Sequence, residues 1–226
     1  KELERRTVLS QYVTYVNCGA GGVPPQETGL TYNSWFGRPH LEMTWWHLAH
    51  YGLWNKPECM EKCFGWFLYA QKLARQIAKR QGFNGIRWMK MTDPSGIEAP
   101  SNVGSYLIWQ QPHFIYLAEL LYRAAKSSAE REELLKKYAG TVNATALFMA
   151  DFAEYDSIRD RYILRGCIPA QETLKADSTI NPPFELSYWH TALQMAEKWR
   201  QRSGIDDKGE WDSIINKLSP LAFNED

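Results

Sequence analysis

The feature that most constrains this fold is the alternation of helical segments with three long loops. Residues 17–40, 83–105 and 166–183 are rich in proline, glycine and other turn residues, whereas the segments between them carry apolar residues at helical spacing. Loops longer than about 15 residues are uncommon in compact domains unless they have a function. Short connections on one side and long ones on the other are typical of stacked helical hairpins. We therefore predict an all-α fold with its long loops on one rim.

The helical pattern divides into segments with recognisable ends. Pro57 begins one helix and Gly82 ends it, and Gln111 with Pro112 forms a cap and a first turn. No fixed 34-residue period is present, which argues against a tetratricopeptide-type solenoid. The sequence "RYIL" suggests a short strand. The predicted helices cover residues 2–16, 42–53, 57–82, 112–126, 129–139, 142–154, 184–202 and 207–218.

Composition and charge narrow the class of protein. With 226 residues, 44% of them hydrophobic, the chain can bury one sizeable core, so residues 1–226 are interpreted as a single domain. Its 26 basic and 26 acidic side chains balance, which argues against nucleic acid or an anionic membrane surface as a partner. No apolar run reaches the roughly 18 residues of a membrane span, and the first ten residues lack the pattern of a signal peptide. We therefore expect no membrane insertion.

The cysteine and histidine patterns predict neither a metal nor a cofactor. The four cysteines are too few and too scattered for a disulfide framework and are interpreted as buried thiols. His40, His47, His50 and Glu42 form the only metal-like cluster, but a zinc signature such as H-E-x-x-H is absent. A histidine of this group either donates a hydrogen bond to a sugar hydroxyl or has its hydrogen bonds satisfied inside the core. Neither a serine-nucleophile elbow nor a glycine-rich phosphate loop occurs.

Several tryptophans lie in the predicted loops rather than in the helical pattern. Trp35 lies near Asn33 and Gly37, Trp88 follows Arg87, and Trp109 precedes Gln110. Aromatic residues on helices are interpreted as core. Those in the loops are at least as well suited to a cleft that stacks the flat face of a ligand and hydrogen-bonds its rim. A sugar ring is such a ligand.

A repeated motif places two glutamates in comparable loops. Pro-x-Gln-Glu-Thr occurs at residues 24–28 and 169–173, each time after a cysteine and ahead of an apolar helix. We interpret the repeat as the trace of two equivalent hairpin units, which predicts that Glu27 and Glu172 face the same side. Glycoside hydrolysis needs two carboxylates facing one cleft, one protonated and one ionised. The carboxylates in or beside the loops are Glu27, Glu42, Glu98, Glu172 and Glu185.

Four blocks of the sequence carry a resemblance to a known family. They read "GRPHLEMTWWHLAHYGLWNKPE", "AKRQGFNGIRWMKMTDPSGIEAP", "YILRGCIPAQET" and "NPPFELSYWHTALQMAEKW". In this order they resemble the catalytic α/α toroid of six-hairpin glycosidases, in particular the maltose, trehalose and kojibiose phosphorylase family and its hydrolase relatives. That toroid has more helices than the seven or eight predicted in this chain. The resemblance therefore implies an incomplete toroid, without its first and last hairpins.

The resemblance implies roles for individual residues. Glu172 matches the general acid that protonates the glycosidic oxygen, and Glu42 sits where the terminal sugar is bound. The base that activates water is Glu185 or a residue outside this chain. The side chains expected to bind the sugar are Glu27, Trp35, His40, Glu42, Arg87, Trp88, Glu98, Trp109 and Gln111.

The implied activity is that of an exo-acting glycosidase with an inverting mechanism, which takes an oligosaccharide or glycoside as substrate and uses no cofactor. Disaccharide phosphorolysis, lyase or epimerase chemistry on a uronate, and carbohydrate binding without catalysis stay open as alternatives. Gln171 stands where the family has an aspartate, and "NPPFE" replaces "NNAYT". Family analogy favours the periplasm or secretion over the cytoplasm.

Overall fold

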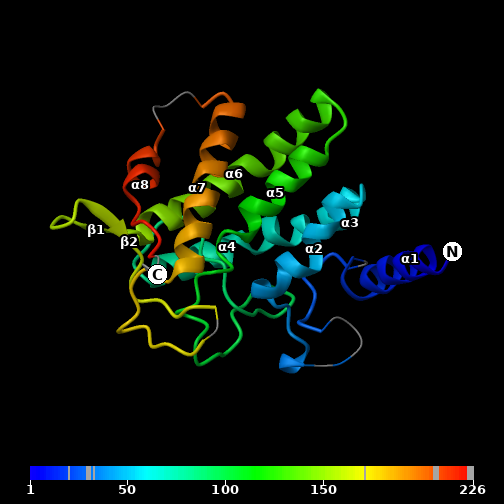
Figure 1. Cartoon of the computed structure of the whole chain (residues 1–226), viewed down its shortest axis with the longest axis horizontal. Helices are drawn as coiled ribbons and strands as arrows, with labels where there is room; N and C mark the ends of the chain where they lie inside the picture. The colour runs from blue at the N-terminus through cyan, green and yellow to red at the C-terminus, as the bar shows by residue number, and fades with distance from the viewer. Residues whose placement is uncertain (20, 29–31, 33, 171, 206–208, 223–226) are drawn as a thin grey trace.

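The computed structural model describes residues 1–19, 21–28, 32, 34–170, 172–205 and 209–222 (Figure 1). It is mostly helical, with one short antiparallel hairpin in which Tyr155 lies opposite Tyr162. The helices are α1 (Glu2–Thr14), a π-helix (Tyr15–Gly19), 3-10 helices (Trp35–Gly37 and Leu41–Met43), α2 (Thr44–Leu53), α3 (Pro57–Glu61), α4 (Phe64–Arg80), α5 (His113–Ala124), α6 (Ser128–Phe152), α7 (Pro183–Arg202) and α8 (Asp212–Lys217). The strands are β1 (Glu154–Asp156) and β2 (Arg161–Ile163), and β2 confirms the predicted strand.

The long helices pack as hairpins in two layers. α5 packs against α2 on one side and α7 on the other, and α6 packs against α5, α7 and α4. The short connection between α5 and α6, residues 125–127, lies at the top of Figure 1, whereas the long loops lie together at the bottom. The prediction of an all-α fold with its long loops on one side is confirmed.

The helices at residues 129–154 differ from the prediction. The segments predicted at residues 129–139 and 142–154 form one helix, α6, which continues through Gly140. A glycine inside a helix costs about 1 kcal/mol, but buried Tyr138 and Val142 anchor the helix on either side of it. At the start of α6 the Ser127 side chain accepts a hydrogen bond from the Glu130 N–H at 3.1 Å.

The opposite error occurs at residues 57–82, where the predicted single helix is divided into α3 and α4. Cys63 is buried at the break, and its Sγ lies 3.7 Å from the carbonyl oxygen of Val23. This contact joins the break to the first long loop. The last helix begins at Asp212, and Asp207, its predicted start, lies outside the described residues.

The main core lies between the helix layers and is rich in aromatic side chains. Phe67 packs edge-on against Trp88, with their ring centroids 5.1 Å apart. Trp189 is fully buried and its Nε1 donates to the Met149 carbonyl at 2.8 Å. A second, smaller cluster of Leu107, Trp109 and Ile168 lies under the loops. Such satellite clusters fix long loops in place, and here the cluster joins two of the three.

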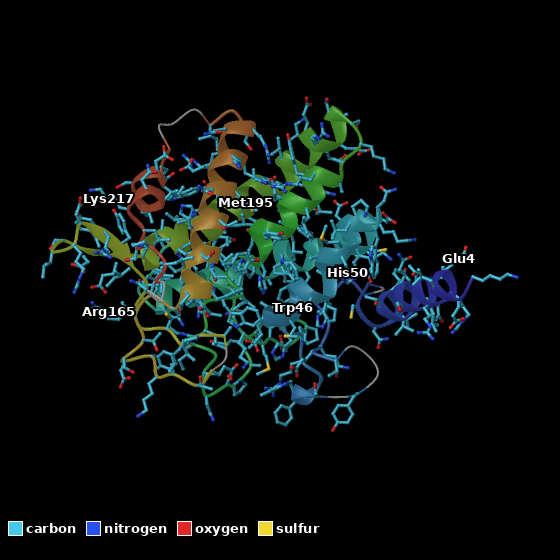
Figure 2. The ribbon with its side chains drawn as sticks, in the orientation of Figure 1. Glu4, Trp46, His50, Arg165, Met195 and Lys217 are labelled. Carbon is cyan, nitrogen blue, oxygen red and sulfur yellow. The ribbon has the colours of Figure 1, made fainter. Side chains whose placement is uncertain are left out.

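α1 differs from the other long helices because none of its residues is buried. Its predicted apolar stripe is present but not buried, with Leu3 78% and Tyr12 64% exposed. Figure 2 labels Glu4 on this helix, which projects from the body of the fold. In the part of the chain that the structure describes, no helix is long and apolar enough to span a membrane.

Candidate active site

A cleft of about 460 Å³ opens on the loop side of the fold. All three long loops and the starts of α2 and α7 contribute to its walls. The lining residues are Glu27, Trp35, Glu42, Met43, Trp46, Lys90, Trp109, Ala170, Glu172 and Phe184. The structure therefore brings together, in one cleft, five residues that the sequence predicted for the site: Glu27, Trp35, Glu42, Trp109 and Glu172.

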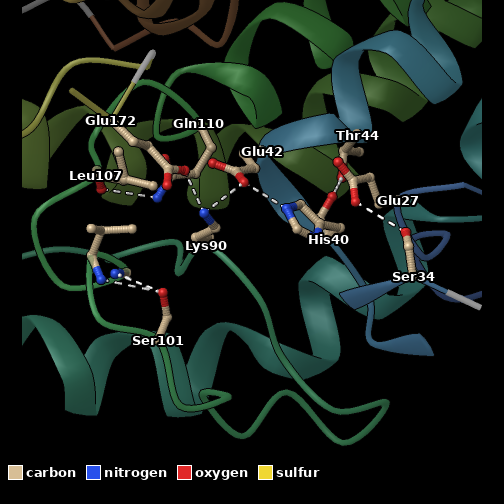
Figure 3. A network of polar contacts seen from close by, with 12 residues as sticks. Glu27, Ser34, His40, Glu42, Thr44, Lys90, Ser101, Leu107, Gln110 and Glu172 are labelled. Carbon is tan, nitrogen blue, oxygen red and sulfur yellow. Dashed lines mark hydrogen bonds and ion pairs between the residues drawn. The ribbon is translucent and has the colours of Figure 1, made fainter. Parts of the chain in front are cut away.

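A buried lysine joins two carboxylates at the centre of the cleft (Figure 3). Lys90 Nζ lies 3.2 Å from Glu42 Oε1 and also forms an ion pair with Glu172. The same ammonium group lies 5.1 Å from the centroid of the Trp35 ring, a cation–π contact. The Lys90 and Glu42 side chains are buried, whereas the Glu172 side chain is 32% exposed. Of the two carboxylates, Glu172 is therefore the one that reaches the open part of the cleft.

Glu42 is held as a carboxylate by the groups around it. His40 Nε2 lies 2.5 Å from Oε1, and Trp109 Nε1 donates to Oε2 at 3.1 Å. Burial by itself raises the pKa of Glu42, but the His40 hydrogen bond and the Lys90 charge outweigh burial and lower this pKa below its ordinary value. Glu42 is therefore a buried negative charge at neutral pH.

The backbone explains why these side chains meet. His40 N donates to the Pro25 carbonyl at 3.0 Å, and Leu41 N donates to the Lys90 carbonyl at 2.9 Å. The two residues before Glu42 are thus bonded to an earlier part of the first loop and to the second loop. Because the Leu41 bond joins the two backbones directly, the Lys90 and Glu42 side chains start from adjacent positions.

His113, at the start of α5, supports the Glu42 backbone. Its Nε2 donates to the Glu42 carbonyl at 2.9 Å, so its Nδ1 accepts from the Tyr188 hydroxyl at 3.0 Å. Burial lowers the pKa of His113 to about 4, which keeps the ring neutral. The inner helices α5 and α7 are therefore part of the support for this carboxylate.

Glu172 has a backbone conformation that is uncommon for a side chain of its size. Its φ is +58°, in the left-handed region, and its N–H donates to the Pro169 carbonyl at 2.8 Å. Such residues cost on the order of 1 kcal/mol and cluster at functional sites. The neighbouring Gln171, where the sequence departs from the family, lies outside the described residues.

Glu27 enters the same cleft from the first copy of the repeated motif. Its Oε2 accepts from the Ser34 hydroxyl at 3.1 Å, and its backbone carbonyl lies 2.9 Å from His47 Nε2. Glu27 and Glu172 both line the cleft, which confirms that the two copies of Pro-x-Gln-Glu-Thr face the same side.

Aromatic rings form the walls of the cleft. Trp46 and Phe184 are 52% and 49% exposed, and each packs against Trp109, with centroid distances of 5.5 and 6.1 Å. Figure 2 shows Trp46 at the end of α2 that faces the loops. An exposed ring beside carboxylates provides a flat apolar face next to hydrogen-bond acceptors, the combination that a sugar ring requires.

Sequence reasoning missed Lys90, Trp46 and Phe184. Lys90 stands between two methionines in a loop, and no motif distinguishes it from a surface lysine. Trp46 and Phe184 belong to helix segments whose aromatic residues were interpreted as core. Only the three-dimensional structure shows that the helix ends which carry these two rings lie beside the cleft and leave the rings exposed.

Glu185, predicted as the base, occupies a different environment. It is only 1% exposed, and its Oε1 accepts from the Ala170 N–H at 2.7 Å. Burial raises the pKa of Glu185, because the charged carboxylate loses its contact with water. It is not among the residues that line the cleft. The structure corrects the prediction: Glu185 supports the loop that carries Glu172.

Four predicted sugar ligands also support the loops instead of lining the cleft. Arg87 is buried and donates to the Ser105 carbonyl at 3.2 Å and to the Leu107 carbonyl. Trp88 Nε1 donates to Thr145 Oγ1 at 3.1 Å.

Gln111 accepts from Trp88 N at 2.8 Å and donates to the Ile86 carbonyl at 2.5 Å. Glu98 pairs with Arg80 at 2.7 Å. None of these four residues is among the described residues that line the cleft, which differs from the expectation that they face a sugar. His40 lies behind the cleft wall, where it contacts Glu42.

The described residues contain no group of three histidine, cysteine, aspartate or glutamate side chains arranged to hold a metal ion. The histidines of the metal-like cluster have other contacts. His47 Nε2 bonds to the Glu27 carbonyl, and the His50 ring packs against Trp54 with centroids 4.3 Å apart.

Comparison with known proteins identifies the fold. No protein-family model and no curated protein matches the chain. A solved structure described as "Putative kojibiose phosphorylase from human microbiome" superposes with a TM-score of 0.69 at 13% sequence identity. The match covers 93% of this chain and 32% of that chain, so this chain spans about a third of the length of its structural neighbour. The predicted fold class, all-α with helical hairpins of the six-hairpin glycosidase type, is confirmed for the part of that fold which this chain covers.

Proposed function

We propose that this chain forms the sugar-cleaving site of a carbohydrate-active enzyme, a glycoside hydrolase that removes a terminal sugar from an oligosaccharide or glycoside. The observation that carries the proposal is the meeting of Glu42 and Glu172 on the single ammonium group of Lys90, in a cleft walled by aromatic rings. Glycoside cleavage requires two carboxylates with different protonation states in one cleft. The six-hairpin fold, shared with a protein described as a phosphorylase, supports this reading.

The two carboxylates suit different roles. Glu42 is buried, ionised and held by several donors, so it stabilises the positive charge that develops on the sugar ring in the transition state. Glu172 is the more exposed of the two and takes the role of general acid. In the free protein Glu172 is paired with Lys90, and a general acid must carry a proton. A bound sugar therefore has to separate Glu172 from Lys90.

The charges in the cleft favour hydrolysis of a neutral sugar. Lys90 is the only lysine or arginine among the described residues that line the cleft, and it already pairs with two carboxylates. Three glutamates against one lysine leave the cleft negative, which disfavours a uronate and an attacking phosphate. Glu27, the remaining carboxylate of the cleft, replaces Glu185 as our candidate for the base that activates water in an inverting mechanism.

Glu172→Gln tests the proposal. Glutamine keeps the size of the side chain but carries no acidic proton, so turnover of an unactivated disaccharide should fall by about 10² to 10⁴. Binding, followed by tryptophan fluorescence, should be retained. The matched control is Glu98→Gln, a loop glutamate outside the cleft, which should keep wild-type turnover. Wild-type activity of Glu172→Gln would exclude this residue as the general acid.

The same assay separates hydrolysis from phosphorolysis. Disaccharides are incubated with the protein in the absence and presence of inorganic phosphate, and the products are identified by proton NMR. Hydrolysis predicts a free sugar in both cases, first released as the anomer opposite to that of the substrate. A sugar phosphate formed only with phosphate present would establish phosphorolysis instead.

A further inference from the structure

Glu172 borders a second cleft as well as the first. This cleft has a volume of about 600 Å³ and lies between the second and third long loops. Among the described residues, Glu172 alone lines both clefts. The proposed proton donor therefore stands at a boundary, with the Glu42 cleft on one side and this cleft on the other.

The second cleft differs from the first in chemistry. Its apolar lining includes Val103, Tyr106, Ile168 and Leu174, and two of these side chains are open to solvent, Tyr106 at 47% and Leu174 at 52%. Among the described residues of its lining, the charged side chains besides Glu172 are Lys175 and Asp177, which balance each other. A neutral group with an apolar or aromatic face fits this lining.

The walls of the second cleft are held by backbone hydrogen bonds. Ile168 N donates to the Tyr106 carbonyl at 3.0 Å, which joins the two loops side by side. Tyr106 N donates to the Val103 carbonyl at 2.9 Å. On the other wall, the Thr179 hydroxyl donates to the Lys175 carbonyl at 2.7 Å. The cleft is thus formed before a ligand arrives, which reduces the entropy cost of binding.

We propose that the second cleft binds the leaving group of the substrate and selects leaving groups with an apolar or aromatic face. The inference rests on the proposed function, since it needs Glu172 as the general acid. A general acid protonates the oxygen that joins the two halves of a glycoside, so those halves lie on either side of it. The terminal sugar occupies the Glu42 cleft and the leaving group occupies the cleft beyond Glu172.

The reaction balances with the groups named. The bond between the anomeric carbon and the glycosidic oxygen breaks, and its electron pair stays on that oxygen. The oxygen takes the proton of Glu172, so the leaving group departs as a neutral alcohol or phenol. Water adds to the anomeric carbon and gives a proton to the base. The second cleft then holds a neutral product, in agreement with its balanced charge.

A pair of substrates that share one terminal sugar tests the selection. An aryl glycoside fills the second cleft, whereas the methyl glycoside of the same sugar leaves it empty. Tyr106→Ala or Leu174→Ala should lower kcat/KM for the aryl glycoside by about tenfold, because the lost apolar contact is worth roughly 1.5 kcal/mol or more. The methyl glycoside should be cleaved at the wild-type rate. Tyr69→Ala, which removes an exposed tyrosine of α4, is the matched control.

A binding measurement keeps the inference testable without turnover. 4-Nitrophenol is titrated into the protein and followed by NMR, with the expectation that signals of Tyr106 and Leu174 shift and that Tyr106→Ala weakens the binding. If Glu172→Gln abolishes turnover while the ratio of aryl to methyl activity is unchanged in both alanine variants, the leaving-group site is refuted and the proposed function stands. If Glu172→Gln is fully active, the proposed function fails, and 4-nitrophenol binding still decides whether the cleft takes an aromatic group.

Discussion

Glu42 and Glu185 are both glutamates at the loop-side start of an inner helix, and both are almost fully buried, at 6% and 1% exposed. Their pKa values nevertheless move in opposite directions. Burial raises the pKa of Glu42, but its contacts with His40 and Lys90 outweigh burial, and Trp109 donates a further hydrogen bond. Glu185 accepts a hydrogen bond from the Ala170 N–H, which lowers its pKa by less than burial raises it. Burial alone therefore does not decide the charge of a buried carboxyl group; the number and charge of its donors do.

This difference separates a site residue from a supporting residue. A carboxylate that several donors keep ionised beside an open cleft is available to a ligand as a charge. A carboxyl group that is buried under a loop, with its pKa raised, is available only to the backbone above it. Both were predicted from sequence as site residues, since a helix-start glutamate beside a long loop looks the same in either case.

Removing the cation should have the largest effect, because it makes Glu42 resemble Glu185. In Lys90→Met, Glu42 and Glu172 lose the charge between them, and the loss of one partner of a buried ion pair typically costs about 3 to 5 kcal/mol. Chemical denaturation measures the change in the free energy of unfolding. The surface variant Lys217→Met, which breaks an exposed pair with Asp160, should show no measurable change. Equal stability of the two variants would contradict the proposed role of Lys90.

Glu42→Gln should come next in size. It removes the charge but keeps the shape, so His40 and Trp109 lose charge-assisted hydrogen bonds, a loss of about 1 to 3 kcal/mol in stability. The variant should also lose turnover, because in the proposed reaction Glu42 faces the sugar. Denaturation and disaccharide cleavage are measured on the same preparation. Full activity would show that the buried charge is not needed for the reaction.

The smallest effects should appear as opposite pH dependences of stability. The folded-state pKa of Glu42 is lowered, so its contribution is fully present above its unfolded pKa, near 4.3, and is lost as pH falls through the folded value. The folded-state pKa of Glu185 is raised, so its contribution is present below the unfolded pKa and is lost as pH rises through the folded value.

The matched pair for this test is Glu42→Gln and Glu185→Gln, with Tm measured between about pH 3 and 8. The advantage of wild type over Glu42→Gln should grow as pH rises. Its advantage over Glu185→Gln should shrink as pH rises, and that variant should be at least as stable as wild type at neutral pH. If the difference in Tm from wild type changed with pH in the same direction for both variants, the two pKa values would not be shifted in opposite directions.

The fold was predictable because its main signals are long and redundant. Three loops far above the usual length, separated by apolar helices, leave few arrangements other than hairpins with one loop-rich rim. The boundary errors arose where single residues decide, at Gly140, which α6 tolerates, and at Cys63, where a bend is coupled to the first loop.

The site was predictable only in part because loop sequences do not reveal which side chains face the cleft. Glu27 and Glu172 were placed correctly in the cleft, since the repeated motif gave them equivalent positions. In the second loop, neighbouring residues point to different environments: Arg87 and Trp88 point into the core, whereas Lys90 points into the cleft. Because an irregular backbone has no periodicity, the sequence of a loop does not show which of its side chains face the core and which face the cleft. Only three-dimensional contacts, such as the bond between Leu41 and Lys90, determine it.

The hydrogen bonds between the loops have a consequence for how such a site diversifies. The first loop is bonded to the second through Leu41 and Lys90, and the second to the third through Tyr106 and Ile168. Changing the length of one loop at these points would displace its neighbours, so new specificities should arise by exchanging side chains on a conserved backbone. Insertions are expected in the stretches between these bonds. We therefore expect the loops of the rim to change together, so that transplanting a single loop into a related protein would not carry the specificity with it.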